Sequence, residues 1–242
     1  TDCLNFGNPE VAEISWQFRE AVRGMSEACR AFAVPVVSGN VSFYNETEGR
    51  SIHPTPTVAM VGVIPTLANL PEAYFLSADD RIVLLGKDRA EFGGSAYLRL
   101  LYGVEQGLPP AVDLDAERDL AELLRRLVYS GLVHTAHDLA EGGLAVALAE
   151  ACFGRRLGAT VEVPLTGVEL FSETQARAIV AANPASLDRV LRAAEEVGVP
   201  ALEIGEVGGG DLVVRAGGET LKAAVADLHA IWSTALPKAL GL

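Results

Sequence analysis

The chain of 242 residues carries a formal net charge of −13, and half of its residues are hydrophobic. This acidity argues against a general nucleic-acid surface, because such a surface needs clustered lysine and arginine to displace counterions. The apolar content allows a sizeable core in one large or two smaller domains. The longest uncharged stretch, Ser51–Pro71, contains several prolines, so it cannot form one membrane-spanning helix, and we expect no membrane partner.

Cysteine usage and the first residues indicate the setting of the chain. Cys3, Cys29 and Cys152 are odd in number and widely spaced in apolar surroundings, which predicts reduced core thiols in a cytosolic protein. The chain opens at Thr1 without an initiator methionine and without a basic-then-apolar signal segment. We therefore expect a fragment or a processed piece of a longer protein.

The first part of the chain predicts one long helix and two strands. Asn8 and Pro9 are suited to the start of a helix whose apolar residues recur at near-helical spacing as far as Phe32. Val34–Val37 is predicted to be a strand that enters a polar loop. Thr57–Ile64 is predicted to be a strand buried on both faces.

The rest of the chain predicts a mixture of helices and strands. A segment rich in Pro, Thr and Asn, Pro65–Pro71, is the candidate boundary between domains 1–65 and 66–242. Asp88 and Glu91 have capping-box spacing before a helix that ends near Tyr102. The other expected elements are strands at Arg81–Leu85, Thr160–Val163 and Ala178–Ala182, a helix opened by Asp113 or Asp115 and ended by Gly131, helices at Leu144–Cys152 and Thr220–Leu236, a helix capped by Ser186 and stopped by Gly198, and two short strands joined by a hairpin turn at Gly208–Gly210. Because helices and strands do not alternate strictly, we predict a layered α/β (α+β) fold.

The segment Val36–Thr47 is the most informative in the chain. Gly39 has no Cβ and lets backbone approach a phosphate. Neutral donors and acceptors are supplied by Ser38, Asn40, Ser42 and Asn45, with Glu46 as a carboxylate nearby. Ser-Gly-Asn is also ordinary turn chemistry, and the residues alone favour the turn. Asp2, which precedes the first helix, either contacts a nucleotide or a bound cation or is a loop aspartate that caps a neighbour.

Two later segments are polar enough to carry chemistry. In His134–Leu144, Asp138 and Glu141 are three residues apart and could share a divalent cation, but capping of the following helix is favoured. The two histidines are a weak zinc signal, because no cysteine or third ligand lies in register. In Glu169–Arg177, Glu173 and Arg177 could pair or contact a ligand, and a solvated loop explains them equally well. No nucleophile, P-loop or dinucleotide fingerprint is present.

Five segments in sequence order together resemble the small-type synthetase subunit of the phosphoribosylformylglycinamidine synthase family. Several long motifs in the right order are more specific than any one alone, and the resemblance covers essentially the whole chain. The segments are Thr1–Pro9 (TDCLNFGNP), Ser38–Thr47 (SGNVSFYNET), Pro54–Pro56 before the second predicted strand, Glu91–Ser95 (EFGGS) and His137–Leu144 (HDLAEGGL).

The resemblance implies a parent roughly three times as long, with two pseudo-symmetric halves of the aminoimidazole ribonucleotide synthetase type. This chain resembles its last third. It implies that residues 1–65 are the remainder of an N-terminal-type domain that carries the ATP, magnesium and substrate loop, and that residues 66–242 are a complete C-terminal-type domain with a mixed sheet.

The resemblance also implies the reaction and the site residues. In that family ATP activates the amide oxygen of formylglycinamide ribonucleotide, and ammonia from a partner glutaminase then displaces phosphate in de novo purine biosynthesis. By resemblance Asp2 and Gly39 contact ATP, Asn40 gives an oxygen to Mg²⁺, and Ser42 contacts the ribonucleotide. The implied partners are the missing N-terminal part, the glutaminase subunit and a small accessory subunit.

The catalytic histidine and most metal carboxylates belong, by resemblance, to the first half of the parent. We therefore expect this chain alone to be inactive, and we treat the Asp138 and Glu173 segments as structural or as an auxiliary nucleotide site. Two alternatives remain. One is another ATP-using enzyme of the same superfamily, of the aminoimidazole ribonucleotide synthetase or thiamine-phosphate kinase type, and the other is a non-catalytic scaffold half.

Overall fold

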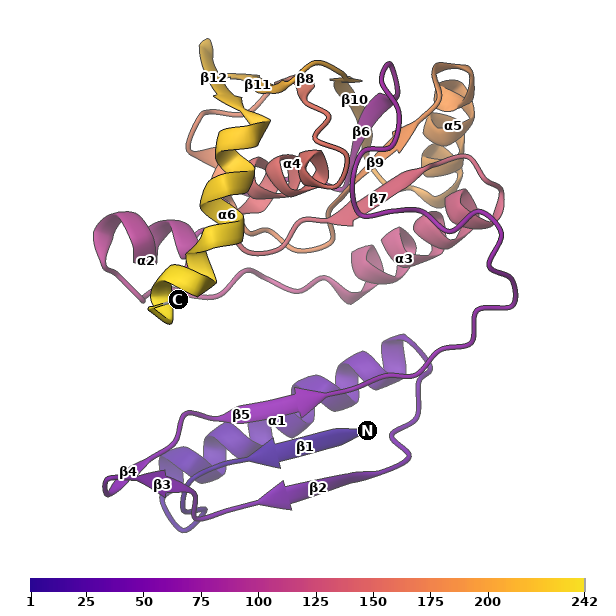
Figure 1. Cartoon of the computed structure of the whole chain (residues 1–242). Helices are drawn as coiled ribbons and strands as arrows, with labels where there is room; N and C mark the ends of the chain where they lie inside the picture. Colours follow the sequence, from indigo (N-terminus) through magenta and orange to yellow (C-terminus); the bar gives the residue numbers. More distant parts are fainter. Residues whose placement is uncertain (242) are drawn as a thin grey trace. The chain divides into compact units, whose positions relative to one another are not determined.

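The computed structural model describes residues 1–241, and the chain divides into two compact units (Figure 1). The N-terminal unit is Thr1–Thr66 and the C-terminal unit is Leu67–Leu242. Each unit has its own sheet and its own hydrophobic core. Among residues 1–241, no helix combines the length and the apolar character that crossing a bilayer requires.

The N-terminal unit is a three-stranded sheet with one helix, α1, along one face (Figure 1). The strand order is β2-β1-β5, in which β1 pairs with β2 in parallel and with β5 in antiparallel orientation. Leu4 and Phe6 from β1 and its end pack against Ile14 of the helix. The elements are β1 (Asp2–Asn5), α1 (Ala12–Ala31), β2 (Gly39–Ser42), β3 (Glu46–Thr47), β4 (Arg50–Ser51) and β5 (Thr55–Val58).

The start of the long helix and the first predicted strand differ from expectation. The helix is confirmed, but its N-cap is Val11, because Asn8 Oδ1 accepts the Glu10 N–H at 2.9 Å in a turn before it. Val34–Val37 is not a strand. The Val34 N–H bonds to Cys29 O at 2.9 Å after left-handed Ala33, so this segment completes the helix end, and the strand begins at Gly39.

The second predicted strand is shorter and far more exposed than expected. It spans only Thr55–Val58, none of its residues is buried, and beyond it Val61 and Val63 are 101% and 91% exposed. Only Thr57 and Val58 of the predicted strand Thr57–Ile64 lie in β5, and β5 is an edge strand paired with β1, so the prediction is wrong for residues 59–64. Burial needs a covering layer, which the pattern of one segment does not reveal.

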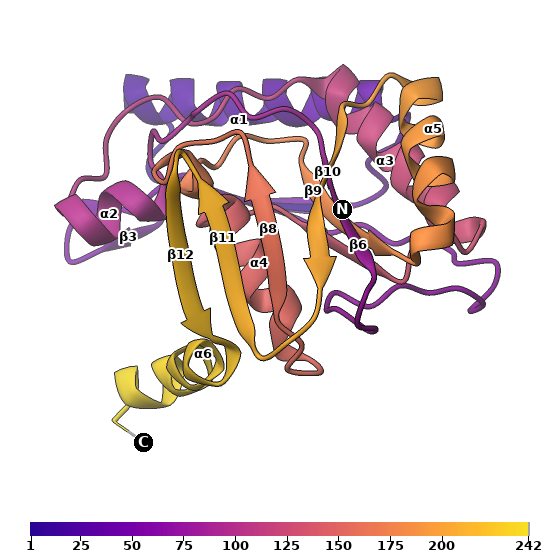
Figure 2. The same ribbon diagram turned by 90° about the horizontal axis from the view of Figure 1, so that it is seen from above.

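The C-terminal unit is built on a seven-stranded mixed sheet with the order β12-β11-β8-β10-β6-β9-β7. All neighbouring strands are antiparallel except β8 and β11. Figure 2 shows β12, β11, β8 and β10 side by side. The strands are β6 (Arg81–Leu85), β7 (Thr135–Asp138), β8 (Ala159–Val163), β9 (Ala178–Ala182), β10 (Ala201–Val207), β11 (Asp211–Ala216) and β12 (Glu219–Ala224).

Helices cover both faces of this sheet and create two cores. On one face, Leu144 and Leu148 of α4 pack against Ile82 and Ile179 of the sheet. On the other face, α3 and α5 pack against side chains such as Val83 of β6. The helices are α2 (Ala96–Tyr102), α3 (Leu114–Tyr129), α4 (Gly143–Phe153), α5 (Leu187–Val197) and α6 (Val225–Ala239), with short 3₁₀ turns at Glu169–Phe171 and Pro184–Ser186. The predicted layered α/β fold is confirmed.

Most predicted elements of this unit are present, and four details are wrong. Ser186 is the N-cap residue of α5 but makes no side-chain cap hydrogen bond. Gly208–Gly210 does not make a hairpin, because β8 lies between β10 and β11 in the sheet. The last predicted helix begins as strand β12, and α6 starts only at Val225. The α2 helix is capped by Ser95, whose Oγ accepts the Leu98 N–H at 3.3 Å, and not by the Asp88–Glu91 pair.

The three cysteines are free thiols in different surroundings. Cys3 and Cys29 are half-buried, and Cys152 is fully buried in the core around α4. Burial raises the pKa of the Cys152 thiol to about 12, and only the thiolate is a good nucleophile. At pH 8 we expect Ellman's reagent to titrate Cys3 and Cys29 in the native chain and Cys152 only after denaturation. Equal reaction rates for all three thiols would contradict this.

Candidate functional site

The two faces of the N-terminal sheet differ in composition. In the register of the sheet Asp2 lies opposite Gly39, and Cys3 lies opposite Asn40. Directly paired residues project to the same face, and successive residues alternate between faces. The face that packs on α1 therefore carries Asp2, Leu4, Gly39, Val41, Pro56 and Val58, and the opposite face carries Cys3, Asn5, Asn40, Ser42, Thr55 and Thr57.

Gly39 makes room for the carboxylate of Asp2. A Cβ built on Gly39 would overlap Asp2 Oδ1 and would lie 2.9 Å from the Asp2 carbonyl oxygen. Among residues 1–241 the Asp2 carboxylate receives no hydrogen bond, and it lines a cavity of about 560 Å³ together with Met25 and Cys29 of α1 and Val36. Glycine at position 39 therefore leaves space for the Asp2 side chain, and the Asp2 carboxylate remains available to a ligand.

The opposite face is polar along its whole width. One row across the three strands is Ser42, Asn5 and Thr55. The next row is Asn40, Cys3 and Thr57. The unit has one helix, which packs on the other face, so these neutral amide and hydroxyl groups have no helix of the unit over them, and Asn40 is exposed.

The four predicted site residues thus form two pairs rather than one cluster. Asp2 and Gly39 lie on the helix-covered face, and Asn40 and Ser42 lie on the polar face. Because β2 is an edge strand, its two faces can be reached around one backbone edge. Asn5, Thr55 and Thr57 share the polar face, which sequence reasoning missed, although the period-two alternation of a strand is the signal that places them there.

The histidines of the second segment have separate partners. His134 Nδ1 lies 3.2 Å from Oδ2 of buried Asp80, and His137 Nδ1 lies 2.7 Å from the Asp138 carbonyl oxygen. His137 Nε2 lies 3.5 Å from Glu150 Oε2. Over residues 1–241, no group of three or more His, Cys, Asp or Glu side chains is arranged to hold a metal ion.

Asp138 and Glu141 do not cap α4. Asp138 ends strand β7 and its side chain is 82% exposed, and the N-cap of the helix is Gly142 without a side-chain cap from its own segment. The cap comes from elsewhere in the sequence. Glu173 Oε1 accepts the backbone N–H of Gly142 and that of Ala96 in the first turn of α2, both at 2.9 Å. Glu173 therefore ties together the N-terminal ends of two helices.

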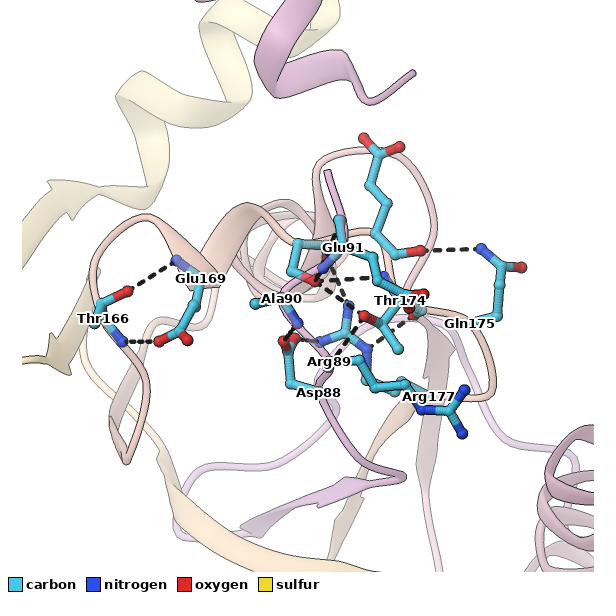
Figure 3. A network of polar contacts seen from close by, with 11 residues as sticks. Asp88, Arg89, Ala90, Glu91, Thr166, Glu169, Thr174, Gln175 and Arg177 are labelled. Atoms are coloured by element: carbon cyan, nitrogen blue, oxygen red, sulfur yellow. Dashed lines mark hydrogen bonds and ion pairs between the residues drawn. The ribbon is translucent and has the colours of Figure 1, made fainter. Parts of the chain in front are cut away.

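Arg177 is the centre of a buried polar network (Figure 3). Its side chain is 0% exposed, and it forms an ion pair with Asp88. It also donates to the carbonyl oxygens of Thr174 at 2.9 Å and Ser172 at 2.6 Å. Burial lowers the pKa of Arg177, and Asp88 acts in the opposite direction. Of the readings left open for this segment, neither a Glu173–Arg177 pair nor a solvated loop is found, because each side chain has its own structural partners and Arg177 is buried.

Replacing Glu173 by alanine should leave two backbone N–H groups without their acceptor. An unsatisfied buried donor costs about 1–3 kcal/mol, so we expect Glu173→Ala to lower the free energy of unfolding of the C-terminal unit by about 2 kcal/mol. Glu173→Gln keeps the Oε1 acceptor and should cost less than half as much. Urea denaturation followed by circular dichroism measures both, and an equal loss in the two variants would contradict the capping role.

Two family models and several curated relatives match this chain over most of its length. The model of the N-terminal domain of AIR synthase related proteins matches residues 1–64, and that of the C-terminal domain matches residues 77–217. The phosphoribosylformylglycinamidine synthase subunit PurL of Moorella thermoacetica is 47% identical over 241 residues, which cover 98% of this chain and 33% of that protein. The same-named subunit of Caldanaerobacter subterraneus is 43% identical over 224 residues, 91% of this chain and 31% of that protein. These relatives confirm the resemblance, and the chain spans about a third of their length.

Solved structures share the fold at low sequence identity. Thermotoga maritima PurL complexed with FGAR aligns with a TM-score of 0.71 at 19% identity, over 94% of this chain and 39% of that one. The hydrogenase maturation protein HypE aligns with a TM-score of 0.62 at 19% identity, over 91% of this chain and 74% of that one. With two family models covering most of the sequence, the chain belongs to the AIR synthase related protein family.

Proposed function

We propose that this chain is part of the ATP-dependent ligase that converts formylglycinamide ribonucleotide and ammonia into formylglycinamidine ribonucleotide, ADP and phosphate in de novo purine biosynthesis. Its similarity to relatives named phosphoribosylformylglycinamidine synthase subunit PurL supports the proposal. The observation that carries it is the edge strand β2. This strand has a free carboxylate, Asp2, beside one face and a neutral polar surface on the other.

Asp2 of β1 and the residues on β2 fit the groups that such a reaction brings together. In this proposal Asp2 and Gly39 contact ATP, Asn40 supplies an oxygen to Mg²⁺, and Ser42 contacts the ribonucleotide. The exposed amide of Asn40 suits Mg²⁺, which prefers oxygen ligands. A nucleotide held around the free edge of β2 would reach the Asp2–Gly39 pair on one face and Asn40 on the other.

The chemistry of phosphoryl transfer explains why these groups are needed. Mg²⁺ supplies charge neutralisation at the transferring phosphoryl group when it is bound. The chain's own residues position the reactants, Ser42 by a hydrogen bond to the ribonucleotide and Asp2 by contact with the hydroxyl or amino groups of the nucleotide. Positioning of this kind supplies a large part of the rate in phosphoryl transfer, because little covalent chemistry is left to the protein.

The proposal includes the partners of the parent enzyme and its location in the cytoplasm. The remaining N-terminal part of the synthetase would supply the catalytic histidine and most of the metal carboxylates. A glutaminase subunit would deliver ammonia, and a small accessory subunit would complete the complex. The solved structure of PurLQS from Thermotoga maritima, which aligns with a TM-score of 0.67, supports a multisubunit assembly of this kind.

The test uses the chain both alone and in a chimaera. In the chimaera the chain replaces the matching third of the Moorella thermoacetica subunit, to which it is 47% identical. With ATP, Mg²⁺, ammonium and formylglycinamide ribonucleotide, we expect amidine formation by the chimaera and none above background by the isolated chain. Turnover by the isolated chain would contradict the division of roles. A folded but inactive chimaera would favour another reaction of the superfamily, and an active chimaera that tolerates Asn40→Ala would favour the scaffold alternative.

A further inference from the structure

In the turn that follows β2, the side chain of Asn45 connects the ends of β1 and β2 by hydrogen bonds to Phe6 and Ser42. Tyr44 adopts a left-handed backbone conformation, with φ of 59°, and its N–H bonds to Gly7 O at 3.0 Å. This fold of the chain brings half-buried Asn45 back between the ends of β1 and β2. The Asn45 backbone N–H also donates to the Phe6 carbonyl oxygen, at 3.2 Å.

The hydrogen bonds of the Asn45 amide fix its orientation. Nδ2 lies 2.9 Å from the Ser42 carbonyl oxygen and 3.1 Å from that of Phe6. If the amide were flipped, Oδ1 would face two carbonyl oxygens, and neither of them can donate a hydrogen bond. Nδ2 is therefore the atom that donates to the two carbonyl groups, and Oδ1 is left as an acceptor.

This orientation determines the direction of the Ser42 hydroxyl. Ser42 Oγ lies 3.2 Å from Asn45 Oδ1 and 3.1 Å from Nδ2. Nδ2 donates to Ser42 Oγ as well as to the two carbonyl groups, and the Ser42 hydroxyl donates its one hydrogen to Oδ1. At least one lone pair of Ser42 Oγ then remains for a ligand, and a ligand group that meets it must itself be a donor.

We infer that Asn45 is a positioning residue that holds the Ser42 hydroxyl as a hydrogen-bond acceptor, so that Ser42 recognises a donor group of the ribonucleotide, a sugar hydroxyl or an amide N–H, and not a phosphate oxygen. This inference rests on the proposed function, in which Ser42 contacts the ribonucleotide. It adds a residue to the site and specifies the chemical class of the group that Ser42 contacts.

A double-mutant cycle in the chimaera tests the coupling of the two residues. Loss of one net hydrogen bond should raise the KM for formylglycinamide ribonucleotide about 5-fold in Ser42→Ala. Asn45→Ala should raise it by a similar factor, and the double variant should be no worse than the poorer single variant. The KM for ATP should change less than about 2-fold. Asn183→Ala, which removes an exposed turn-capping amide in the other unit, is the matched control and should leave both KM values unchanged.

The outcomes separate this inference from the proposed function. An inactive chimaera, or an active one in which Ser42→Ala has the KM of the parent, overturns the proposed function or the assignment of Ser42. A normal effect of Ser42→Ala with additive or absent effects of Asn45→Ala overturns the positioning role alone. Thermal denaturation reports whether each variant is folded.

Two further measurements keep the inference testable if Asn45→Ala does not fold. Asn45→Asp retains an acceptor for the Ser42 hydroxyl and loses both donors, so it should be less stable while its ribonucleotide KM stays within about 2-fold of the parent. A KM raised as far as in Ser42→Ala would overturn the role of the acceptor.

Ribonucleotide analogues that lack one sugar hydroxyl or carry an N-methylated amide test the donor. The analogue that lacks the donor contacted by Ser42 should bind the parent and Ser42→Ala with equal affinity, because it can no longer use the serine hydroxyl. If every analogue still binds the parent more tightly, recognition of a donor group is wrong.

Discussion

Replacing Arg177 by alanine is expected to lower the free energy of unfolding of the C-terminal unit by about 3–5 kcal/mol. The guanidinium is 0% exposed, and it is the ion-pair partner of Asp88, whose side chain is 9% exposed. Its removal leaves a carboxylate in a site from which water is largely excluded, and it also removes donors from the Ser172 and Thr174 carbonyl groups. Denaturant unfolding of the chain, monitored by circular dichroism, measures the loss.

A surface ion pair in the same unit supplies the control for Arg177. Lys222 Nζ lies 2.8 Å from Asp211 Oδ2, but the two side chains are 63% and 40% exposed. Exposed pairs of this kind contribute about 0–1 kcal/mol, so Lys222→Ala should lie within about 1 kcal/mol of the parent. Similar losses in the two variants would show that burial does not set the cost. In the double variant Asp88→Asn/Arg177→Ala, the loss should be smaller than in Arg177→Ala, because no unpaired charge remains.

Replacing Gly39 by alanine is expected to weaken ATP binding about 10- to 100-fold in the chimaera, the range that corresponds to loss of one hydrogen bond to a charged group or slightly more. The added methyl group would overlap the Asp2 carboxylate, which would have to move from the face of the sheet where it lines the cavity. Isothermal calorimetry with ATP and Mg²⁺ measures the change in Kd.

Gly24 provides the matched glycine for this experiment. It lies within α1, and a Cβ built there meets no atom within 4 Å. Gly24→Ala should leave ATP binding unchanged and stabilise the N-terminal unit by about 0.5–1 kcal/mol, because alanine loses less backbone entropy in a helix. If Gly39→Ala acts by displacing Asp2, it should cost much less in an Asp2→Ala background. An undiminished cost there would show that Gly39 acts directly, by allowing close approach of the nucleotide.

Local patterns predicted those parts of the fold that depend on a single segment. The α3 helix shows this well, since Asp113 Oδ1 accepts the Ala116 N–H at 3.1 Å and Leu120, Leu123 and Leu127 are buried on one face, as their spacing predicts. The apolar runs Arg81–Leu85 and Ala178–Ala182 are strands with the predicted bounds. In each case the signal is contained in neighbouring residues, so the sequence is sufficient.

Strand order and capping partners depended on residues far apart in the chain. The glycines at 208–210 suggested a hairpin, but β8 inserts between the two strands that they connect. The α4 helix has polar residues in front of it, yet its N-terminal N–H is satisfied by Glu173, 31 residues from Gly142. Nothing in the local pattern specifies such a partner, because caps and neighbours are chosen by the packing of the whole unit.

The sequence by itself determined the family, the layered α/β class and the residues on which the proposed site depends, because long motifs in fixed order are specific even where each motif alone is ambiguous. Only the tertiary structure decided how those residues are arranged. The parallel register of β1 and β2 sets Asp2 against Gly39 on one face and Asn40 and Ser42 on the other. The physical reason is that a strand alternates its side chains with a period of two, while the choice of neighbour and register is made by contacts between distant segments.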